Sequence, residues 1–268
     1  MTASDPPGLG LGTWENENPD QCAESVRTAL ELGYRHIDTA QAYENERAVG
    51  RGIAAADVER DDVFLATKVS MDNLTYDDAK RTARESLDRL GVDYVDLLYV
   101  HWPIRTYDPE GTLAAFDELY EAGVTERVGV SNFEPETLDE ARDRLDAPIF
   151  ANQIELHPFL QQRELREYAA DHDHRVVAYS PLARGDVLED PALQGIAEKH
   201  GATPAQVSLA WLDSLENVTP IPKATSEAHI RDNWAARDLE LDAEDIARIE
   251  ELDEGRRKVD FAPAPWNH

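Results

Sequence analysis

The chain has 268 residues, of which 26 are Lys or Arg and 55 are Asp or Glu, so its formal net charge is −29. This acidity excludes the basic surface that binding to nucleic acids or to anionic membranes requires. Hydrophobic residues make up 41% of the chain, which is typical of a folded core rather than of a disordered acidic segment. The lone Cys22 cannot form an internal disulfide or a thiolate metal site.

The length of the chain and its lack of a recognisable targeting signal predict one globular domain, residues 1–268, in the cytoplasm. The length is within the range of a single α/β barrel. No apolar run is long enough to cross a membrane, and the polar residues 1–5 are not typical of a signal peptide.

The acidic residues are spread along the chain, whereas lysine occurs at only five positions. A solvated acidic surface without a specific partner is the simpler interpretation. We favour adaptation to molar salt, as in a halophile. In molar salt the Debye length falls to about 3 Å and the repulsion among carboxylates is screened.

Short apolar segments alternate along the chain with longer segments of helical periodicity. In chain order we predict a strand at 8–14, a helix at 24–30 that Gly33 ends, a strand at 34–38, a helix at 45–56, a strand at 63–67, a helix at 77–90 with Thr75 as its N-cap, a strand at 95–100, a helix at 113–121, a strand at 128–131, a helix at 135–145, a strand at 150–154, a helix at 163–170, a strand at 176–179, a helix at 204–215, a strand at 219–221 and helices at 226–236 and 243–252.

This alternation predicts a single (β/α)8 barrel of parallel strands, with 243–252 as an extra C-terminal helix and 255–268 as a short loop-like tail. A doubly wound open sheet is the alternative. Gly8, Gly10 and Gly12 lead into a loop rather than a helix, which is not typical of a phosphate-binding turn.

Polar residues follow three consecutive predicted strands, where a barrel places its active site. Asp38 follows the second, Lys68 the third and His101 the fourth, and Tyr43 comes five residues after Asp38. A buried lysine needs a partner, which Asp38 could supply. Each residue taken alone has a structural interpretation: an ion pair, a core imidazole or a loop aromatic.

Together the four residues suit protonation of a carbonyl oxygen while a hydride reaches its carbon. The ordinary pKa of tyrosine, about 10, is too high for acid catalysis near neutrality. We expect the Lys68 cation to lower the pKa of Tyr43. His101 could donate to the substrate oxygen or tune the tyrosine hydroxyl.

Several longer motifs connect these residues to a known family. They are 33–40 (GYRHIDTA), 43–46 (YENE), 66–68 (ATK), 101–103 (HWP), 131–132 (SN), Gln153, 179–182 (YSPL) and 221–223 (IPK). They resemble, in order and over about residues 8–233, the signature of the aldo-keto reductases. The short ending is similar to that of the compact microbial branch, which includes diketo-gluconate and methylglyoxal reductases.

The resemblance implies that Asp38, Tyr43, Lys68 and His101 are the catalytic tetrad, with Tyr43 as the general acid. It also implies a nicotinamide cofactor, whose carboxamide Ser131, Asn132 and Gln153 would hold and whose ring Tyr179 would stack upon. Strand-end capping and core packing are the alternatives for these residues. The remaining cofactor contacts are expected from Gly12, Thr13, Ser180, Leu182, Lys223, Ser226, His229 and Asn233.

NADPH is the expected cofactor, with NADH also used. Relatives that prefer NADPH usually have an arginine where this chain has His229, and Glu227 adds repulsion toward a 2′-phosphate. Trp14 and Trp102 would line the substrate mouth, although packing at the barrel end is an equal alternative for Trp14.

The partner is then a small carbonyl substrate, and we expect a monomer with no metal. Two other classes remain open: a dinucleotide-binding sensor with negligible turnover, and a metal-dependent hydrolase barrel. Val69–Met71 lacks the aromatic residue that often follows the lysine in the family, so one pocket wall is undefined.

Overall fold

The computed structural model describes residues 8–267, so the polar start at 1–5 lies outside it. Eight parallel strands form one sheet in chain order: β1 (Leu11–Gly12), β2 (His36–Asp38), β3 (Phe64–Val69), β4 (Leu97–Val100), β5 (Val128–Ser131), β6 (Ile149–Glu155), β7 (Arg175–Tyr179) and β8 (Val218–Pro220). The sheet closes where the Gly10 amide donates to Pro220 O at 3.0 Å and the Gly12 amide to Pro222 O at 3.1 Å. The predicted (β/α)8 barrel is confirmed.

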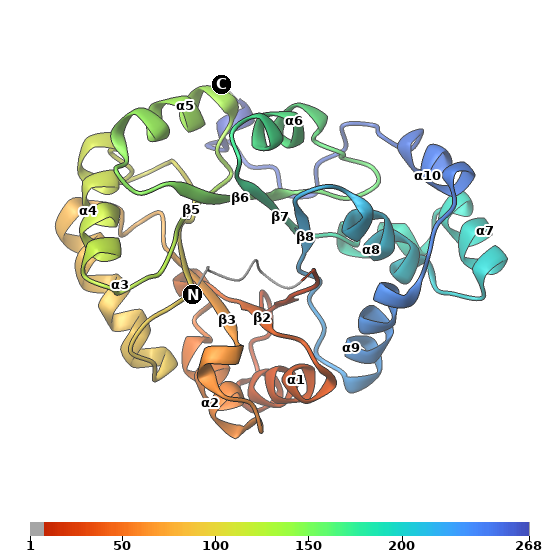
Figure 1. The fold of residues 1–268 in the computed structure, drawn as a ribbon, viewed down its shortest axis with the longest axis horizontal. Helices are drawn as coiled ribbons and strands as arrows, with labels where there is room; N and C mark the ends of the chain where they lie inside the picture. Colours follow the sequence, from red (N-terminus) through yellow and green to blue (C-terminus); the bar gives the residue numbers. More distant parts are fainter. Residues whose placement is uncertain (1–7, 268) are drawn as a thin grey trace.

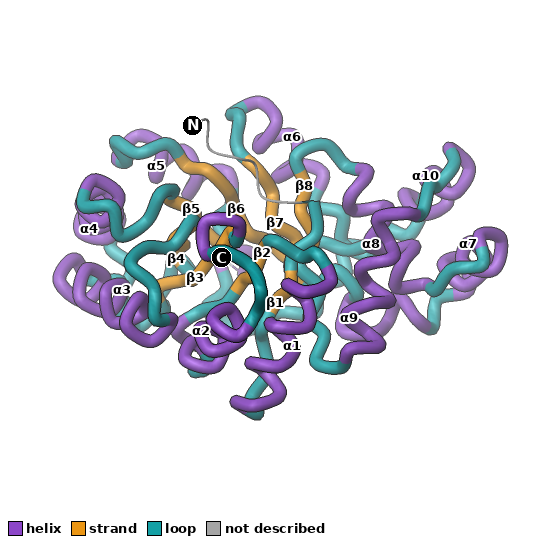
Figure 2. Tube along the Cα trace, turned by 60° about the horizontal axis from the view of Figure 1, so that its bottom comes forward, coloured by secondary structure: helices purple, strands orange, loops and turns teal. Residues whose placement is uncertain are grey.

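Helices surround the strands (Figure 1), and Figure 2 shows the same ring from another side. They are α1 (Pro19–Leu32), α2 (Glu46–Ala55), α3 (Tyr76–Leu90), α4 (Pro109–Glu121), α5 (Pro135–Arg144), α6 (Arg163–Asp171), α7 (Pro191–His200), α8 (Pro204–Ser214), α9 (Glu227–Trp234) and α10 (Ala243–Glu250). Short 3-10 turns occur at η1 (Gln41–Tyr43), η2 (Arg60–Asp62), η3 (Ala183–Leu188), η4 (Ala235–Asp238) and η5 (Pro265–Asn267). Among the described residues, no helix is both long enough and apolar enough to cross a membrane.

The prediction missed α7, although its start and stop signals are in the sequence. Asp190 caps the helix by accepting the amides of Ala192 and Leu193, Pro191 begins it, and Gly201 ends it at a φ of +62°. The apolar pattern is short here, which hid the helix.

The first predicted strand was too long, whereas Thr75 is confirmed as the N-cap residue of α3, without a capping hydrogen bond. The first strand covers Leu11–Gly12 alone, because the chain turns after Gly12 and Glu15 has a φ of +54°. Thr75 lies at the N-cap position of α3, but its hydroxyl bonds the Asp78 carboxylate rather than a helix amide.

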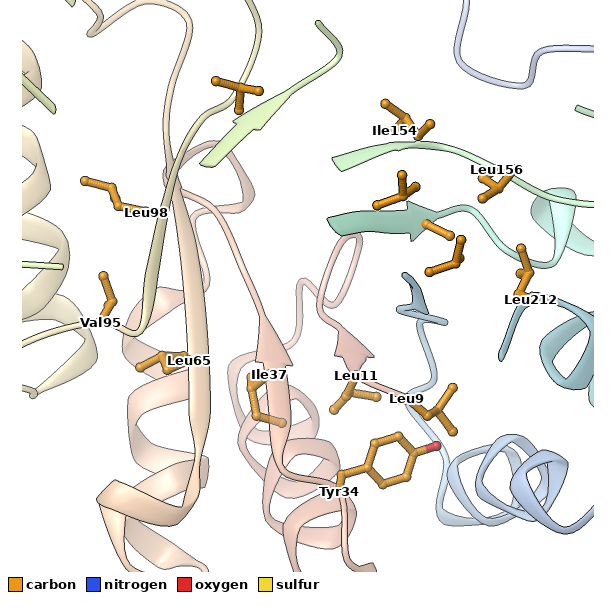
Figure 3. Close-up of a cluster of buried hydrophobic side chains, with 14 of the residues drawn as sticks. Leu9, Leu11, Tyr34, Ile37, Leu65, Val95, Leu98, Ile154, Leu156 and Leu212 are labelled. Carbon is orange, nitrogen blue, oxygen red and sulfur yellow. The ribbon is translucent and has the colours of Figure 1, made fainter. Parts of the chain in front are cut away.

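Two buried layers hold the barrel together. In the larger one, side chains such as Ile37, Leu65 and Leu98 point from the strands toward the helices (Figure 3). The smaller one fills the barrel interior with Phe64, Ala66, Leu97, Tyr99, Ala151, Val177 and Ile221. This interior layer closes the barrel beneath the carboxyl ends of the strands, so a ligand can enter only from above them.

Gly50 sets the distance between α2 and α3. A Cβ at this position would lie 2.1 Å from the backbone oxygen of Leu90, which cannot rotate away. We expect Gly50→Ala to lower the free energy of unfolding by about 1–3 kcal/mol through overpacking. Gly195→Ala in α7, where the nearest atom would be 3.6 Å away, should instead gain about 0.5–1 kcal/mol from helix propensity. Unfolding in denaturant measures the free energy of unfolding of both variants, and equal changes in the two would contradict the prediction.

Candidate active site

A cavity of about 520 Å³ opens at the carboxyl ends of the strands. Fourteen of the predicted site residues line it: Gly12, Thr13, Trp14, Asp38, Tyr43, His101, Trp102, Ser131, Asn132, Gln153, Tyr179, Ser180, Leu182 and Lys223. Lys68 lies beneath the cavity and is fully buried. Ser226, His229 and Asn233 do not line it. They lie on or just before α9, where the Ser226 hydroxyl caps the helix by accepting the His229 amide at 3.3 Å.

Lys68 is held by three acceptors. Its Nζ donates to Asp38 Oδ1 at 2.5 Å, to the Thr39 carbonyl at 2.8 Å and to Tyr43 Oη at 3.4 Å. An ammonium has three N–H donors, so this arrangement uses all of them. The buried ion pair expected between Lys68 and Asp38 is therefore present.

The partners of Lys68 keep it charged. Burial acts to lower its pKa, but Asp38 and Tyr43 outweigh burial, and the net shift is upward. Asp38 has a second partner, because Gln153 Nε2 donates to its Oδ2 at 2.7 Å. The pair is thus fully hydrogen-bonded, which a buried charge requires.

Tyr43 lies at the end of η1, with its hydroxyl beside the lysine. Its pKa is raised, because burial outweighs the opposing effect of Lys68. Our expectation of a lowered pKa was wrong in sign. The lysine offsets part of the burial effect, and Tyr43 keeps its proton at neutral pH.

His101 follows β4, and its ring packs edge-on against Tyr43 with centroids 5.9 Å apart. Burial, with a smaller contribution from Lys68, lowers its pKa to about 3. The imidazole is therefore neutral near pH 7. It can donate one hydrogen bond but carries no excess proton, so Tyr43 is the better proton donor of the two.

Polar side chains from β5 to β7 form a connected group beside these residues. The Ser131 hydroxyl donates to Gln153 O at 2.8 Å, and Asn132 Nδ2 donates to Ser131 Oγ at 2.9 Å. The Tyr179 hydroxyl donates to Asn132 Oδ1 at 2.8 Å. Asn132 has a φ of +64°, a left-handed conformation that asparagine tolerates better than most residues. The network fixes the Tyr179 ring at the cavity wall, as stacking would require.

Two cations face the cavity although the protein as a whole is strongly acidic. Arg184 of η3 and Lys223 after β8 both line it, and neither forms an ion pair with any residue between 8 and 267. Unpaired positive charge fits a pyrophosphate or phosphate ligand. The prediction included Lys223 but missed Arg184, which the sequence marks only as a loop residue after a strand.

These features fit a nicotinamide dinucleotide. The cavity offers an aromatic face at Tyr179, amides and hydroxyls at Asn132 and Ser131, and cations for the phosphates. In the part of the chain that the structure describes, no three His, Cys, Asp or Glu side chains converge as metal ligands would.

The mouth of the cavity is lined by aromatic residues and by the tail. Trp14 and Trp102 both line it, as does Val259, a tail residue that the sequence analysis did not single out. The Arg184 guanidinium lies 4.8 Å from the centre of the Trp14 ring, a cation–π contact across the opening. Trp14 is therefore part of the cavity wall rather than of the barrel packing alone.

Comparisons with known proteins agree with this geometry. The sequence profile of the aldo/keto reductase family matches residues 8–254. An aldo-keto reductase of Mycolicibacterium smegmatis is 43% identical over 94% of this chain and 91% of its own. Methylglyoxal reductase DkgB of Escherichia coli O157:H7 is 42% identical over 94% and 95%. A crystal structure of a candidate 2,5-diketo-D-gluconic acid reductase B superposes with a TM-score of 0.93 at 38% identity, covering 97% of this chain and 92% of that one.

Proposed function

Because the chain belongs to the aldo/keto reductase family, we propose that it reduces small aldehydes and ketones at this cavity with Tyr43 as the proton donor. The observation that carries the assignment is the buried Asp38–Lys68 pair with the Tyr43 hydroxyl on the third donor of the ammonium. The Ser131–Asn132–Tyr179 network would hold the nicotinamide, and Arg184 and Lys223 would face its phosphates.

The reduced nicotinamide, when bound, supplies a hydride to the carbonyl carbon. Tyr43 gives its hydroxyl proton to the carbonyl oxygen, and Lys68 stabilises the phenolate that is left. Asp38 keeps the lysine charged and aimed at that oxygen. Neutral His101 donates one N–H to the carbonyl oxygen and orients it.

A cofactor-oxidation assay with glyoxals, aldoses, keto-sugars and aromatic aldehydes tests this function. We expect turnover with small carbonyls, and methylglyoxal is the first to try, because a relative is named for its reduction. Cofactor binding without turnover on any carbonyl would instead support a sensor. That alternative is not favoured, since relatives over nearly the whole chain are named as reductases.

We propose a moderate preference for NADPH over NADH. Lys223 lines the cavity, and exposed His229 lies in the first turn of α9. Arg231 cannot serve freely, because it pairs with Glu227 at 2.8 Å. The ratio of kcat/KM for NADPH to that for NADH should exceed one.

His229→Arg should raise this ratio, whereas Lys223→Ala should lower it. A preference for NADH beyond about tenfold, or roughly 1.4 kcal/mol, would refute the assignment. So would an unchanged ratio in Lys223→Ala.

We propose that the protein works as a single-domain monomer in the cytoplasm of a salt-adapted cell. The support is its net charge of −29 and the contacts among Asp38, Tyr43, Lys68 and His101, which are all made within one chain. Molar KCl should raise the melting temperature relative to dilute buffer, since it screens repulsion among the carboxylates. No rise would contradict the salt adaptation, and sedimentation measures the oligomeric state.

A further inference from the structure

One buried carboxylate fastens the middle of the tail that follows α10 to the barrel. Glu155, at the end of β6, is 1% exposed. Its Oε1 accepts the Lys258 amide at 2.6 Å, and its Oε2 accepts the Val259 amide at 3.0 Å. His157 Nε2 lies 3.1 Å from Oε1. Burial acts to raise the pKa of Glu155, but these three donors outweigh it, and the pKa is lowered. The anchor is therefore ionised at neutral pH.

The fastened segment leads directly into the wall of the substrate mouth. Val259 lines the cavity, and the next residues pack on Trp102. The ring of Phe261 lies 5.0 Å from that of Trp102, and the ring of Trp266 lies 5.6 Å away. Figure 2 shows the last helical turn, beside the C marker, in front of the strands. Tail and tryptophan together form one apolar wall next to His101.

The anchor also gives the tail its register. Two consecutive amides point at the two oxygens of a single carboxylate, so a shift of one residue along the tail would break both bonds. The tail has further contacts. The Glu254 and Arg256 amides both donate to Phe159 O, at 3.2 and 3.0 Å. Lys258 Nζ pairs with Asp186 of η3, and Arg257 lies 3.6 Å from Glu134. These ion pairs are partly exposed and contribute little to position. The Phe159 carbonyl holds the start of the tail, whereas the buried carboxylate holds Lys258 and Val259, next to the cavity wall.

We propose that Glu155 is a positioning residue for substrate specificity, which acts through the tail by holding Val259, Phe261 and Trp266 against Trp102. The inference rests on the carbonyl reduction proposed above. Glu155 does not line the cavity, and its carboxylate bonds the tail segment that does, so we infer that its effect on substrate passes through the tail wall.

Glu155→Gln tests the anchor. Glutamine has one acceptor oxygen, and its NH2 group would face a backbone N–H, so at least one tail bond is lost. We expect the KM for an apolar carbonyl such as phenylglyoxal to rise about tenfold with kcat little changed, the pattern of lost ground-state binding. The cofactor Kd and the pH profile should stay as in the wild type. Amide hydrogen exchange over 255–267 should become faster.

Glu254→Gln is the matched control. It removes the same charge from the start of the tail, but within residues 8–267 the Glu254 side chain pairs with Arg256 alone, at 3.4 Å. We expect the KM and the exchange rates of this variant to equal those of the wild type.

Phe261→Ala removes part of the wall and leaves the anchor in place. Its KM should also rise, and the double variant Glu155→Gln/Phe261→Ala should be no worse than Glu155→Gln, because contacts of a released tail cannot be lost twice. Additive effects on KM would overturn the inference. If Glu155→Gln fails to fold, an unchanged KM in Phe261→Ala would overturn it. A wild type without any turnover would count against the proposed function instead.

Discussion

Tyr43→Phe is expected to lower the kcat of carbonyl reduction by about 10²–10⁴-fold, the usual contribution of a general acid. Of the two cavity-lining residues Tyr43 and His101, the phenol is the proton donor at neutral pH, since the pKa of His101 is lowered to about 3. Phenylalanine keeps the ring that packs edge-on against His101. Steady-state and single-turnover rates of cofactor oxidation measure the loss.

The affinity for the cofactor is the control for this variant. The Tyr43 hydroxyl bonds Lys68 and not the Ser131–Asn132–Tyr179 network, so the cofactor Kd should change little. If the variant keeps more than about a tenth of the wild-type rate while chemistry limits turnover, Tyr43 is not the general acid.

Lys68→Met is expected to be almost as inactive, with a shifted pH profile. Lys68 acts to lower the pKa of Tyr43 and so opposes the effect of burial. Without the cation the pKa of Tyr43 rises further, and the phenolate formed during the reaction loses its partner. Residual activity should be lost at a higher pH than in the wild type, since activity falls when Tyr43 deprotonates.

The same substitution should also destabilise the fold. It leaves Asp38, which is 1% exposed, as a buried carboxylate with Gln153 as its side-chain partner, at a cost of about 3–5 kcal/mol in the free energy of unfolding. The double variant Asp38→Asn/Lys68→Met removes the orphan charge and should recover part of that stability without recovering activity. If a folded Lys68→Met variant loses activity at the same alkaline pH as the wild type, the coupling of Lys68 to Tyr43 is refuted.

The sequence was sufficient to predict the convergence of the catalytic residues. Asp38 ends β2, Lys68 is the last residue but one of β3, and His101 follows β4. A parallel barrel brings such positions to one face. The family motifs then singled out Tyr43 in the loop after β2.

The sign of the Tyr43 pKa shift could not be read from the motifs. It depends on how far burial outweighs one cation, and burial is a property of the packed cavity. The Glu155 anchor was missed for a related reason, because its partners are 103 and 104 residues away in the chain. Arg184 carries no local pattern that distinguishes it from other loop arginines.

In the proposed reaction the bound reduced nicotinamide gives a hydride to the carbonyl carbon, while Tyr43 protonates the carbonyl oxygen. The most direct test is reduction of methylglyoxal with NADPH carrying deuterium at the transferable position. We predict product with deuterium bound to the new carbinol carbon, formed by the wild type and almost absent with Tyr43→Phe. Product without deuterium at that carbon, or equal product from both proteins, would contradict the account.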